Sequence, residues 1–240
     1  AKFTVAHDAT GPGSPVAAGA NVTLTLTAKT VDDKAAVTYK EAAVLKISGG
    51  SGLKLVTASS TGVTEVEAGR YTLSADDWVV GVRTVVFADT VAPDTLSIAV
   101  QDCTDTTNIY VGAADSTVVV GAAARSKIVV DAPESVGMGD MFWVDISYTD
   151  TYGNARVTDN GFVSVSANKL GVEIPVGDVP ITKGIGGIWA KSASWSGTGL
   201  VITARDVLVN GAAPAAALSG TDTIGVDGDG ATVLGAPDTI

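Results

Sequence analysis

The chain has 240 residues, of which 46% are hydrophobic and only 5% aromatic, and its formal net charge at pH 7 is −11. This acidity argues against binding to nucleic acid, because a phosphate backbone needs a basic protein face, and against an anionic membrane surface. No apolar run approaches the roughly 18 residues of a membrane-spanning helix, so we expect no membrane insertion. A single cysteine, Cys103, excludes an intrachain disulfide.

Alternating patterns in the first half of the chain predict strands. In residues 19–28, GANVTLTLTA, aliphatic residues at every second position share one face and threonines share the other. Segments 43–48 and 95–102 alternate in the same way. A period of two indicates strands with one buried and one solvated face. Val and Thr also favour strands, because branching at Cβ suits a pleated, half-buried surface.

The second half of the chain repeats this pattern. Residues 139–148, GDMFWVDISY, align with 19–28 at an offset of 120, and 199–206 align with 95–102, each closing on an aspartate. Roughly seven or eight short strands in each half, separated by turn residues, predict a β-sandwich. We therefore expect an all-β fold class with two tandem sandwich domains.

The repeat also sets the expected domain boundaries. The first domain spans 1–122 and ends with a junction strand formed by the β-branched run 117–120, and the second domain spans 123–226. The remaining residues, 227–240, are either a terminal strand or a truncated linker to a further domain. A terminal strand can add to the exposed sheet edge of another molecule.

Residues 221–236, TDTIGVDGDGATVLGA, contain Asp227 and Asp229 in the spacing of a calcium loop. A self-contained calcium loop also needs an oxygen ligand at its fifth position and a glycine at its sixth, where this stretch has Ala and Thr. Residues 104–122 begin and end the same way, so we first interpret 221–236 as a copy of the closing segment of the first domain. A looser calcium site, built from Asp227, Asp229 and a distant carboxylate, stays open as the alternative. We expect no other cofactor.

No arrangement of residues indicates catalysis. The only histidine, His7, lies on an expected strand, and no Gly-x-Ser-x-Gly elbow is present. Adjacent carboxylates at 32–33 and 76–77 lie in expected turns, whereas glycosidases hold two carboxylates opposite each other across a cleft. We expect that the chain is not an enzyme.

Three tryptophans are the candidate contact residues. Trp143 lies on the outer face of its expected strand, and Trp189 and Trp195 lie on a strand-like stretch with serines between them. Exposed tryptophans are typical of protein interfaces, but they also pack within domains and stack on sugars. We rank a protein interface first, packing within the domain second and sugar binding third.

The segment VDISYTDTYGNARVTDNGFVSVSA, residues 144–167, resembles bacterial immunoglobulin-like repeats of the filamin and invasin kind. Those repeats join two strands by an Asp-x-x-Gly-Asn turn, matched by Asp150, Gly153 and Asn154, and finish on a strand ending ITARD or similar. The first half departs from this pattern, because KTVDDKAAVT lacks the Gly-Asn pair. The resemblance implies two tandem immunoglobulin-like β-sandwich domains. It also implies a place in extracellular arrays such as adhesin stalks, surface layers, surface filaments and accessory domains of secreted enzymes.

Tandem repeats, threonine-rich outer faces and acidic charge favour a structural role. The leading hypothesis is an extracellular, cell-surface protein that assembles with copies of itself into a homopolymer or lattice, as a subunit or fragment of a surface layer or surface filament. The alternative is an adhesin stalk or a carbohydrate-binding accessory module of a secreted protein, with a cell-surface glycan as partner. The fold does not decide between them, because one fold hosts many functions.

Overall fold

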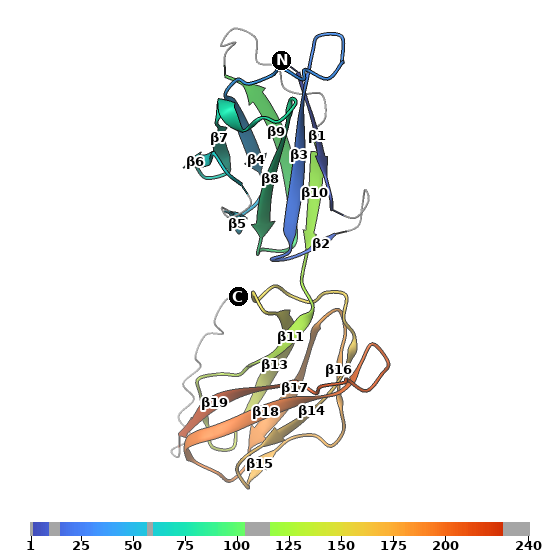
Figure 1. Cartoon of the computed structure of the whole chain (residues 1–240). Coiled ribbons are helices and arrows are strands. Elements are labelled where there is room, and N and C mark those ends of the chain that lie inside the picture. Colours follow the sequence, from blue (N-terminus) through green and yellow to red (C-terminus); the bar gives the residue numbers. More distant parts are fainter. Residues whose placement is uncertain (1, 10–14, 57–59, 104–115, 228–240) are drawn as a thin grey trace. The chain divides into compact units, whose positions relative to one another are not determined.

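The computed structural model describes residues 2–9, 15–56, 60–103 and 116–227. The chain divides into two compact units, Ala1–Ala123 and Ala124–Ile240, and each is built of strands in two facing sheets (Figure 1). The all-β sandwich fold expected from the alternating patterns is therefore confirmed. Among the described residues, the one helical element is a 3-10 turn, η2 (Ala75–Asp77). No helix in this part of the chain is long and apolar enough to cross a membrane.

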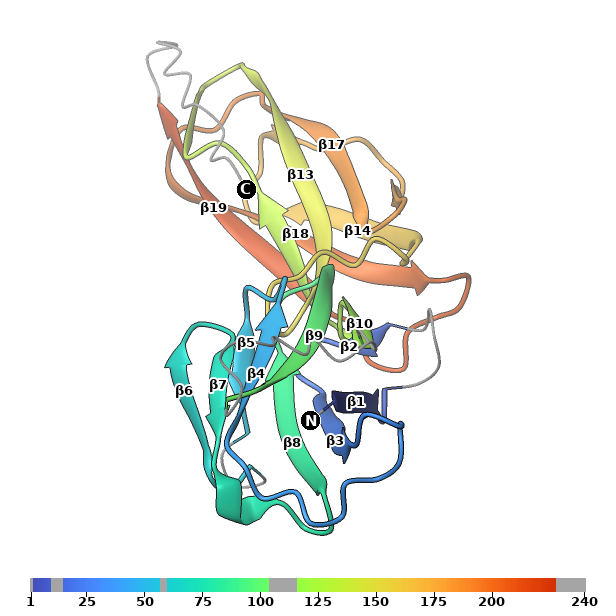
Figure 2. The same cartoon turned by 90° about the horizontal axis from the view of Figure 1, so that it is seen from above.

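Unit 1 consists of a four-stranded and a six-stranded sheet (Figure 2). In spatial order the first sheet contains β1 (Lys2–His7), β3 (Asn21–Lys29), β8 (Val82–Asp89) and β5 (Leu53–Leu55). The second contains β2 (Val16–Ala17), β10 (Ser116–Gly121), β9 (Asp94–Asp102), β4 (Ala43–Ser48), β7 (Arg70–Leu73) and β6 (Val63–Glu67). Strands β2 and β10 pair in parallel, and their neighbours pair antiparallel.

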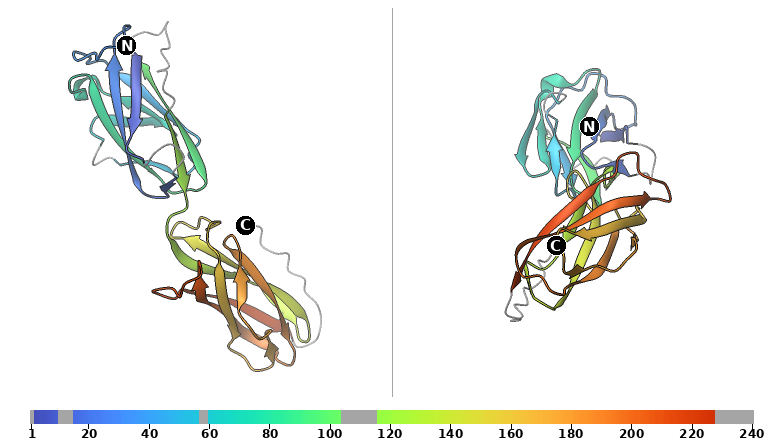
Figure 3. Two further views of the ribbon diagram at one scale, coloured as in Figure 1. Left: turned by 90° about the vertical axis from the view of Figure 1, so that its right-hand side faces the viewer. Right: turned by 90° about the horizontal axis from the view of Figure 1, so that it is seen from below.

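Unit 2 consists of a four-stranded and a five-stranded sheet, which Figure 3 shows from two further sides. The first sheet contains β11 (Arg125–Asp131), β13 (Met141–Asp150), β17 (Ile185–Ser192) and β15 (Val172–Glu173). The second contains β12 (Ser135–Gly137), β19 (Ser219–Asp227), β18 (Gly197–Val209), β14 (Gly161–Ala167) and β16 (Val179–Ile181).

The two units share one strand order. The sheet β1-β3-β8-β5 corresponds to β11-β13-β17-β15, and β2-β10-β9-β4-β7 corresponds to β12-β19-β18-β14-β16. Taken in chain order, the first sheet holds the strands that immunoglobulin sandwiches label A, B, E and D, and the second holds C, F and G. The repeat seen in the sequence is thus a repeat of topology, with β6 added in unit 1.

Alternate side chains of the facing sheets form the core of each unit. The alternation expected in residues 19–28 is confirmed, because Val22, Leu24, Leu26 and Ala28 of β3 are buried and the threonines between them are not. The same alternation in β13 buries Phe142, Val144, Ile146 and Tyr148. Full burial of one such side chain contributes about 1.5–3 kcal/mol, so each strand is held in its sheet chiefly by its inner face.

The turn that carries the family resemblance is organised by a buried carboxylate. Asp150 Oδ1 accepts hydrogen bonds from the backbone N–H groups of Tyr152 (2.8 Å) and Asn154 (3.0 Å). The Asn154 side chain donates to Asp150 Oδ2 (2.9 Å), and Gly153 supplies a φ of 90° between them. The Asp-x-x-Gly-Asn pattern is therefore a self-contained turn in which the aspartate caps the backbone and the glycine allows the left-handed residue.

The run 117–120, expected to be a junction strand between the domains, is part of β10 and pairs with β9. The prediction was wrong because Val118 and Val120 are buried in the core of unit 1, and that burial holds the run inside the sheet. Of the expected terminal segment, Asp227 ends β19, and residues 228–240 lie outside the described residues.

The strand pairing also corrects the alignment of 221–236 with 104–122. Val118 of β10 lies opposite Leu96 of β9, just as Ile224 of β19 lies opposite Leu200 of β18. The closing strands are therefore equivalent at an offset of 106, whereas the two TDT triplets are 117 residues apart. The shared letters do not mark equivalent positions.

In each unit a tight turn with two left-handed residues leads into the third strand of the first sheet, β8 in unit 1 and β17 in unit 2. In unit 1 these are Val80 (φ 52°) and Gly81 (φ 71°), and in unit 2 they are Lys183 (φ 52°) and Gly184 (φ 77°). Such turns match the twist of the flanking strands but favour Asn, Asp or Gly at both central positions. Val80 is an exception, since a β-branched residue is strained at positive φ.

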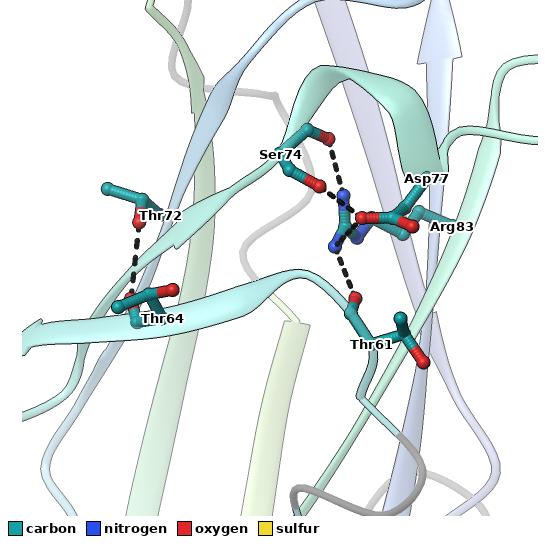
Figure 4. A network of polar contacts seen from close by, with 6 residues as sticks. All are labelled: Thr61, Thr64, Thr72, Ser74, Asp77 and Arg83. Atoms are coloured by element: carbon teal, nitrogen blue, oxygen red, sulfur yellow. Dashed lines mark hydrogen bonds and ion pairs between the residues drawn. The ribbon is translucent and has the colours of Figure 1, made fainter.

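A buried arginine ties two loops of unit 1 to β8. Arg83 donates from Nη1 to the backbone oxygen of Ser74 and from Nη2 to that of Thr61, each at 2.6 Å. Figure 4 shows the guanidinium between these carbonyl groups and the carboxylate of Asp77, which lies 3.4 Å from Nη2 and also accepts a hydrogen bond from the Ser74 hydroxyl. Burial lowers the pKa of Arg83, and the nearby charge of Asp77 opposes that shift.

Replacing Val80 by asparagine is expected to stabilise unit 1 by about 1 kcal/mol, because asparagine adopts the left-handed conformation without the steric cost of a β-branched side chain. Urea unfolding of the full chain measures the change. Lys183→Asn, at the equivalent position of unit 2, is the matched control and should give a smaller gain, since lysine is not branched at Cβ. A lower free energy of unfolding for Val80→Asn would show that Val80 does not strain the turn.

Arg83→Ala is expected to destabilise unit 1 by about 3 kcal/mol, because it leaves two carbonyl groups without their donor and Asp77 without its cation. Thermal unfolding measures the loss. Arg70→Ala is the control, since Arg70 forms an exposed ion pair with Glu67 at 3.5 Å and exposed pairs contribute little. Equal effects of the two substitutions would show that the buried network contributes no more than a surface pair.

Candidate functional site: an exposed tryptophan pair

The outer face of the sheet β11-β13-β17-β15 carries two tryptophans in contact. Trp143 of β13 and Trp189 of β17 are directly opposite each other in the antiparallel register. Their ring centroids are 5.4 Å apart, with an angle of 66° between the ring planes. Alternation predicts that Trp143 points outward, and the residue is 38% exposed, while Trp189 is 52% exposed. Side chains of this size are seldom left in water without a partner.

The indole of Trp143 is fixed by two neighbours. Its Nε1 donates a hydrogen bond to Asp145 Oδ1 at 2.7 Å, two residues along the same outer face. Its ring lies over Gly187 of β17, where an added Cβ would come within 2.3 Å of Trp143 Cζ2. Gly187 has no left-handed φ that would demand glycine, so its absent side chain serves to make room for the indole. The ring of Trp143 is therefore held in one orientation by Asp145 and Gly187.

Further exposed apolar side chains lie on the same face of the sheet. Met141 is two residues before Trp143 on β13, Ile185 lies on β17 opposite Ser147, and Val129 lies on β11 opposite the same serine. All three are exposed. We define the outer Trp face as Val129, Met141, Trp143, Ile185 and Trp189. Of these five residues, only the two tryptophans were candidates from the sequence, because single exposed aliphatic residues are common on protein surfaces.

Among the residues that the structure describes in unit 1, the equivalent face carries no such patch. Thr23 of β3 and Val86 of β8 pair in the positions that Trp143 and Trp189 occupy in unit 2. Val86 is buried, and its backbone N–H and oxygen both hydrogen-bond the hydroxyl of Ser60, at 2.9 and 3.2 Å. The outer Trp face is therefore a specialisation of unit 2 on a shared strand framework.

Trp195 is placed apart from the pair. It follows β17, in the turn before β18, where it packs against the core of unit 2. The ammonium of Lys169 lies 5.5 Å from the centre of its ring, and its backbone oxygen accepts a hydrogen bond from the Ser192 hydroxyl (2.8 Å). The structure thus brings Trp143 and Trp189 together and gives Trp195 a packing role.

The candidate calcium ligands Asp227 and Asp229 are at and beyond the end of β19. Asp227 is its last residue, and Asp229 lies outside the described residues. Within the described part of the chain, no group of three or more His, Cys, Asp or Glu side chains is placed to hold a metal ion. A calcium site at Asp227 and Asp229 therefore stays a prediction.

Gly187→Ala is expected to displace the indole of Trp143, because the new methyl group would occupy the space of its ring. We expect the near-ultraviolet circular dichroism of the tryptophan pair to collapse and stability to fall by about 1–3 kcal/mol. Gly225→Ala is the matched control on β19, since an added Cβ there meets its nearest atom at 3.5 Å. An unchanged spectrum in Gly187→Ala would show that the glycine does not position Trp143.

Comparison with known proteins identifies no family. No protein-family model matches the chain, and no curated protein matches it. Among solved structures, it is similar to a glycosyl hydrolase family 2 member from Bacteroides cellulosilyticus, at 12% identity and a TM-score of 0.39, covering 89% of this chain and 24% of that one. It is also similar to the S-layer protein rSbsC, at 13% identity and a TM-score of 0.31, covering 94% of this chain and 28% of that one.

A third similar structure is the native conformation of E. coli alpha-2-macroglobulin, at 16% identity and a TM-score of 0.35, covering 94% of this chain and 17% of that one. The chain thus spans less than a third of each of these three proteins. Likenesses this weak carry no argument about function. The immunoglobulin-like arrangement rests instead on the strand order of each unit.

Proposed function

We propose that this chain is a structural, non-enzymatic segment of an extracellular cell-surface protein, and that it associates with copies of itself through the outer Trp face of unit 2. In this proposal it contributes to a surface layer or surface filament. The observation that carries the proposal is the exposed, pre-positioned pair Trp143–Trp189. The tandem immunoglobulin-like topology supports it, because such units stack into arrays without needing a catalytic cleft.

The composition of the outer Trp face fits a protein interface. Tryptophan, methionine and branched aliphatic residues supply its area, and tryptophan is enriched among the residues that dominate binding energy. Because Gly187 and Asp145 already fix the Trp143 ring, association costs little side-chain entropy there. The rings therefore favour binding to a second surface of matching shape.

The ring geometry favours a protein over a sugar as the partner. A sugar ring stacks on a flat aromatic face, whereas the planes of Trp143 and Trp189 are inclined by 66° and offer no common plane. The hydrogen bond from Trp143 Nε1 to Asp145 also uses the donor that would orient a sugar hydroxyl. A carbohydrate-binding module remains the second candidate, because either ring alone still presents an exposed face.

Charges around the patch suit a copy of the same chain. Charged side chains of both signs share its face at the flanking register positions: Asp131, Asp145, Glu173 and Lys191. In a two-fold pairing of such faces, Lys191 of one copy is available to pair with an acid of the other copy. The chain carries a net charge of −11, so its copies repel each other and we expect added salt to strengthen the association.

Three tyrosines with raised pKa values serve packing in the cores of the two units. Burial raises the pKa of Tyr71 to about 12, with Glu65 contributing. Burial likewise raises the pKa of Tyr39, beside Asp102, and of Tyr148, beside Asp206. Each of these tyrosines belongs to the hydrophobic core of its unit, which supports a role in holding strands together.

Sedimentation velocity of the full chain over a range of concentrations tests the proposal. The wild-type chain is expected to self-associate, and the double variant Trp143→Thr/Trp189→Thr, which copies the threonine of unit 1, is expected to weaken the association at least about tenfold. Leu170→Thr is the matched control, because Leu170 is an isolated residue of unit 2 that is 97% exposed.

Two outcomes would overturn the proposed interface. A wild-type chain that stays monomeric at high concentration and moderate salt would exclude self-association through this face. Equal association of the double variant and the wild type would place the interface elsewhere. If the monomeric wild type instead binds glycans and the double variant does not, the carbohydrate-binding alternative holds.

A further inference from the structure

The inner face of β8 ends at a carboxylate that is buried without a charged partner. Asp89 is only 3% exposed. Its Oδ1 accepts a hydrogen bond from the backbone N–H of Val91 at 3.0 Å, but its Oδ2 has no hydrogen-bond partner. No Lys or Arg of the described residues forms an ion pair with it. A buried carboxylate is costly unless it is protonated or balanced by a cation.

A second carboxylate lies beside the first. Asp94, the first residue of β9, holds the loop between β4 and β5, because its Oδ2 accepts hydrogen bonds from the backbone N–H (2.9 Å) and hydroxyl (3.0 Å) of Ser51. Burial, and then the like charge of Asp94, raise the pKa of Asp89 above that of an ordinary aspartate. Two carboxylates side by side are a donor set for a divalent cation.

The backbone of the loop between β4 and β5 packs closely against the Asp89 carboxylate. An added Cβ on Gly50 would lie 2.7 Å from Asp89 Oδ2, and one on Gly52 would lie 2.7 Å from Asp89 Oδ1 and 2.6 Å from Thr90 Oγ1. Neither glycine has a left-handed φ. The backbone conformation therefore does not require glycine at either position, and the missing side chains let the loop approach the Asp89 carboxylate closely.

Neutral oxygen donors lie at the same loop. The hydroxyl of Thr90 donates to the backbone oxygen of Gly52 at 3.3 Å, so both oxygens lie at the loop that surrounds Asp89. Calcium takes six to eight oxygen ligands from carboxylates, hydroxyl or carbonyl groups and water, whereas magnesium demands a stricter octahedron. A flexible set of two carboxylates and neutral oxygens suits the larger ion.

We propose that Asp89 and Asp94 bind a calcium ion in unit 1, with Thr90 Oγ1, the Gly52 backbone oxygen and water completing its ligands. This site is separate from Asp227 and Asp229 and independent of the outer Trp face. With two carboxylates it belongs to the weak class, with a dissociation constant of about 0.1–1 mM, which is typical of extracellular modules. The ion neutralises both carboxylates and joins the loop before β5 to the turn before β9.

Unit 2 provides a natural comparison, because it lacks the buried carboxylate at the equivalent position. In unit 1, Gly19 N–H donates to the Asp89 backbone oxygen at 2.6 Å. In unit 2, Gly139 N–H donates to the backbone oxygen of Ser192 at 2.5 Å, so Ser192 holds the place of Asp89. The Ser192 hydroxyl is satisfied by a backbone oxygen of the turn that follows β17.

The second carboxylate is missing from unit 2 as well. In unit 1, Asp94 of β9 lies opposite Val120 of β10. The equivalent pair in unit 2 is Gly197 of β18 and Val226 of β19, so a glycine holds the place of Asp94. Because unit 2 has no carboxylate at either position, no cation is needed there to balance charge.

Thermal unfolding and calorimetric titration of the full chain with calcium chloride test the proposal, with magnesium chloride as the second probe. At 10 mM calcium the unfolding temperature of the wild-type chain should rise by about 5 °C or more. Asp89→Asn and Asp94→Asn should each abolish that rise and the binding heat. Asp32→Asn, which removes an exposed turn carboxylate of the same unit, should retain both.

Asparagine has the same shape as aspartate, so Asp89→Asn tests the charge while preserving the fold. Without calcium, Asp89→Asn should unfold at the same temperature as the wild type or higher, since it removes an unpaired buried charge. The proposal is overturned if the wild type shows neither heat nor a shift with calcium. It is equally overturned if Asp89→Asn keeps the shift while Asp227→Asn loses it, which would place the ion at the end of β19. An equal response to magnesium would contradict the assignment to calcium.

Discussion

Alternate side chains buried between two facing sheets are the interaction on which both units depend. In β3 and β13 every second residue lies in the core, and the hydrogen-bonded register of these strands with β8 and β17 follows from that burial. Because the inner face supplies the stability, the outer face and the strand ends can vary without loss of the fold. We therefore expect functional residues on the outer faces and at the strand ends, where burial does not dictate the residue type.

The two units illustrate how one framework is specialised. At equivalent positions of the same strand, unit 1 has Arg83 and Asp89 at the two ends of β8, and unit 2 has Gly186 and Ser192 in β17. Two loop carbonyl groups accept hydrogen bonds from the arginine, and one accepts a hydrogen bond from the serine. In unit 1 the buried polar residues at the ends of β8 contact the loops. In unit 2 the distinctive residues are Trp143 and Trp189, which lie on the exposed outer face of the sheet.

The sequence predicted the features that follow from local periodicity. Alternation of period two identified β3 and β13 and placed Trp143 outward, because successive side chains of a strand point to opposite faces. It did not predict the contact between Trp143 and Trp189, which depends on the register of two strands far apart in the chain. The glycine pair preceding Ile188, unusual inside a strand, was the one local signal of a close approach.

Tertiary effects explain the predictions that failed or were missing. The β-branched sequence of 117–120 suits a strand that connects two domains as well as a strand at the end of a sheet. Its pairing with β9 and the burial of Val118 and Val120 show that it belongs to the sheet. Asp89 resembles any aspartate at a strand end until the loop before β5 covers it. Both depend on which segments meet in space, and strand propensity carries little information about that.

The parallel pairing at the end of each sandwich has a mechanical consequence. Strand β2 lies near the start of unit 1 and β10 at its end, and Val16 and Ala17 pair in parallel with Val120 and Gly121. A force that pulls the two ends of the unit apart therefore slides these strands along each other and loads their hydrogen bonds together, in shear. Antiparallel neighbours joined by a hairpin would instead be peeled apart one bond at a time. Strands β12 and β19 give unit 2 the same resistance to tension.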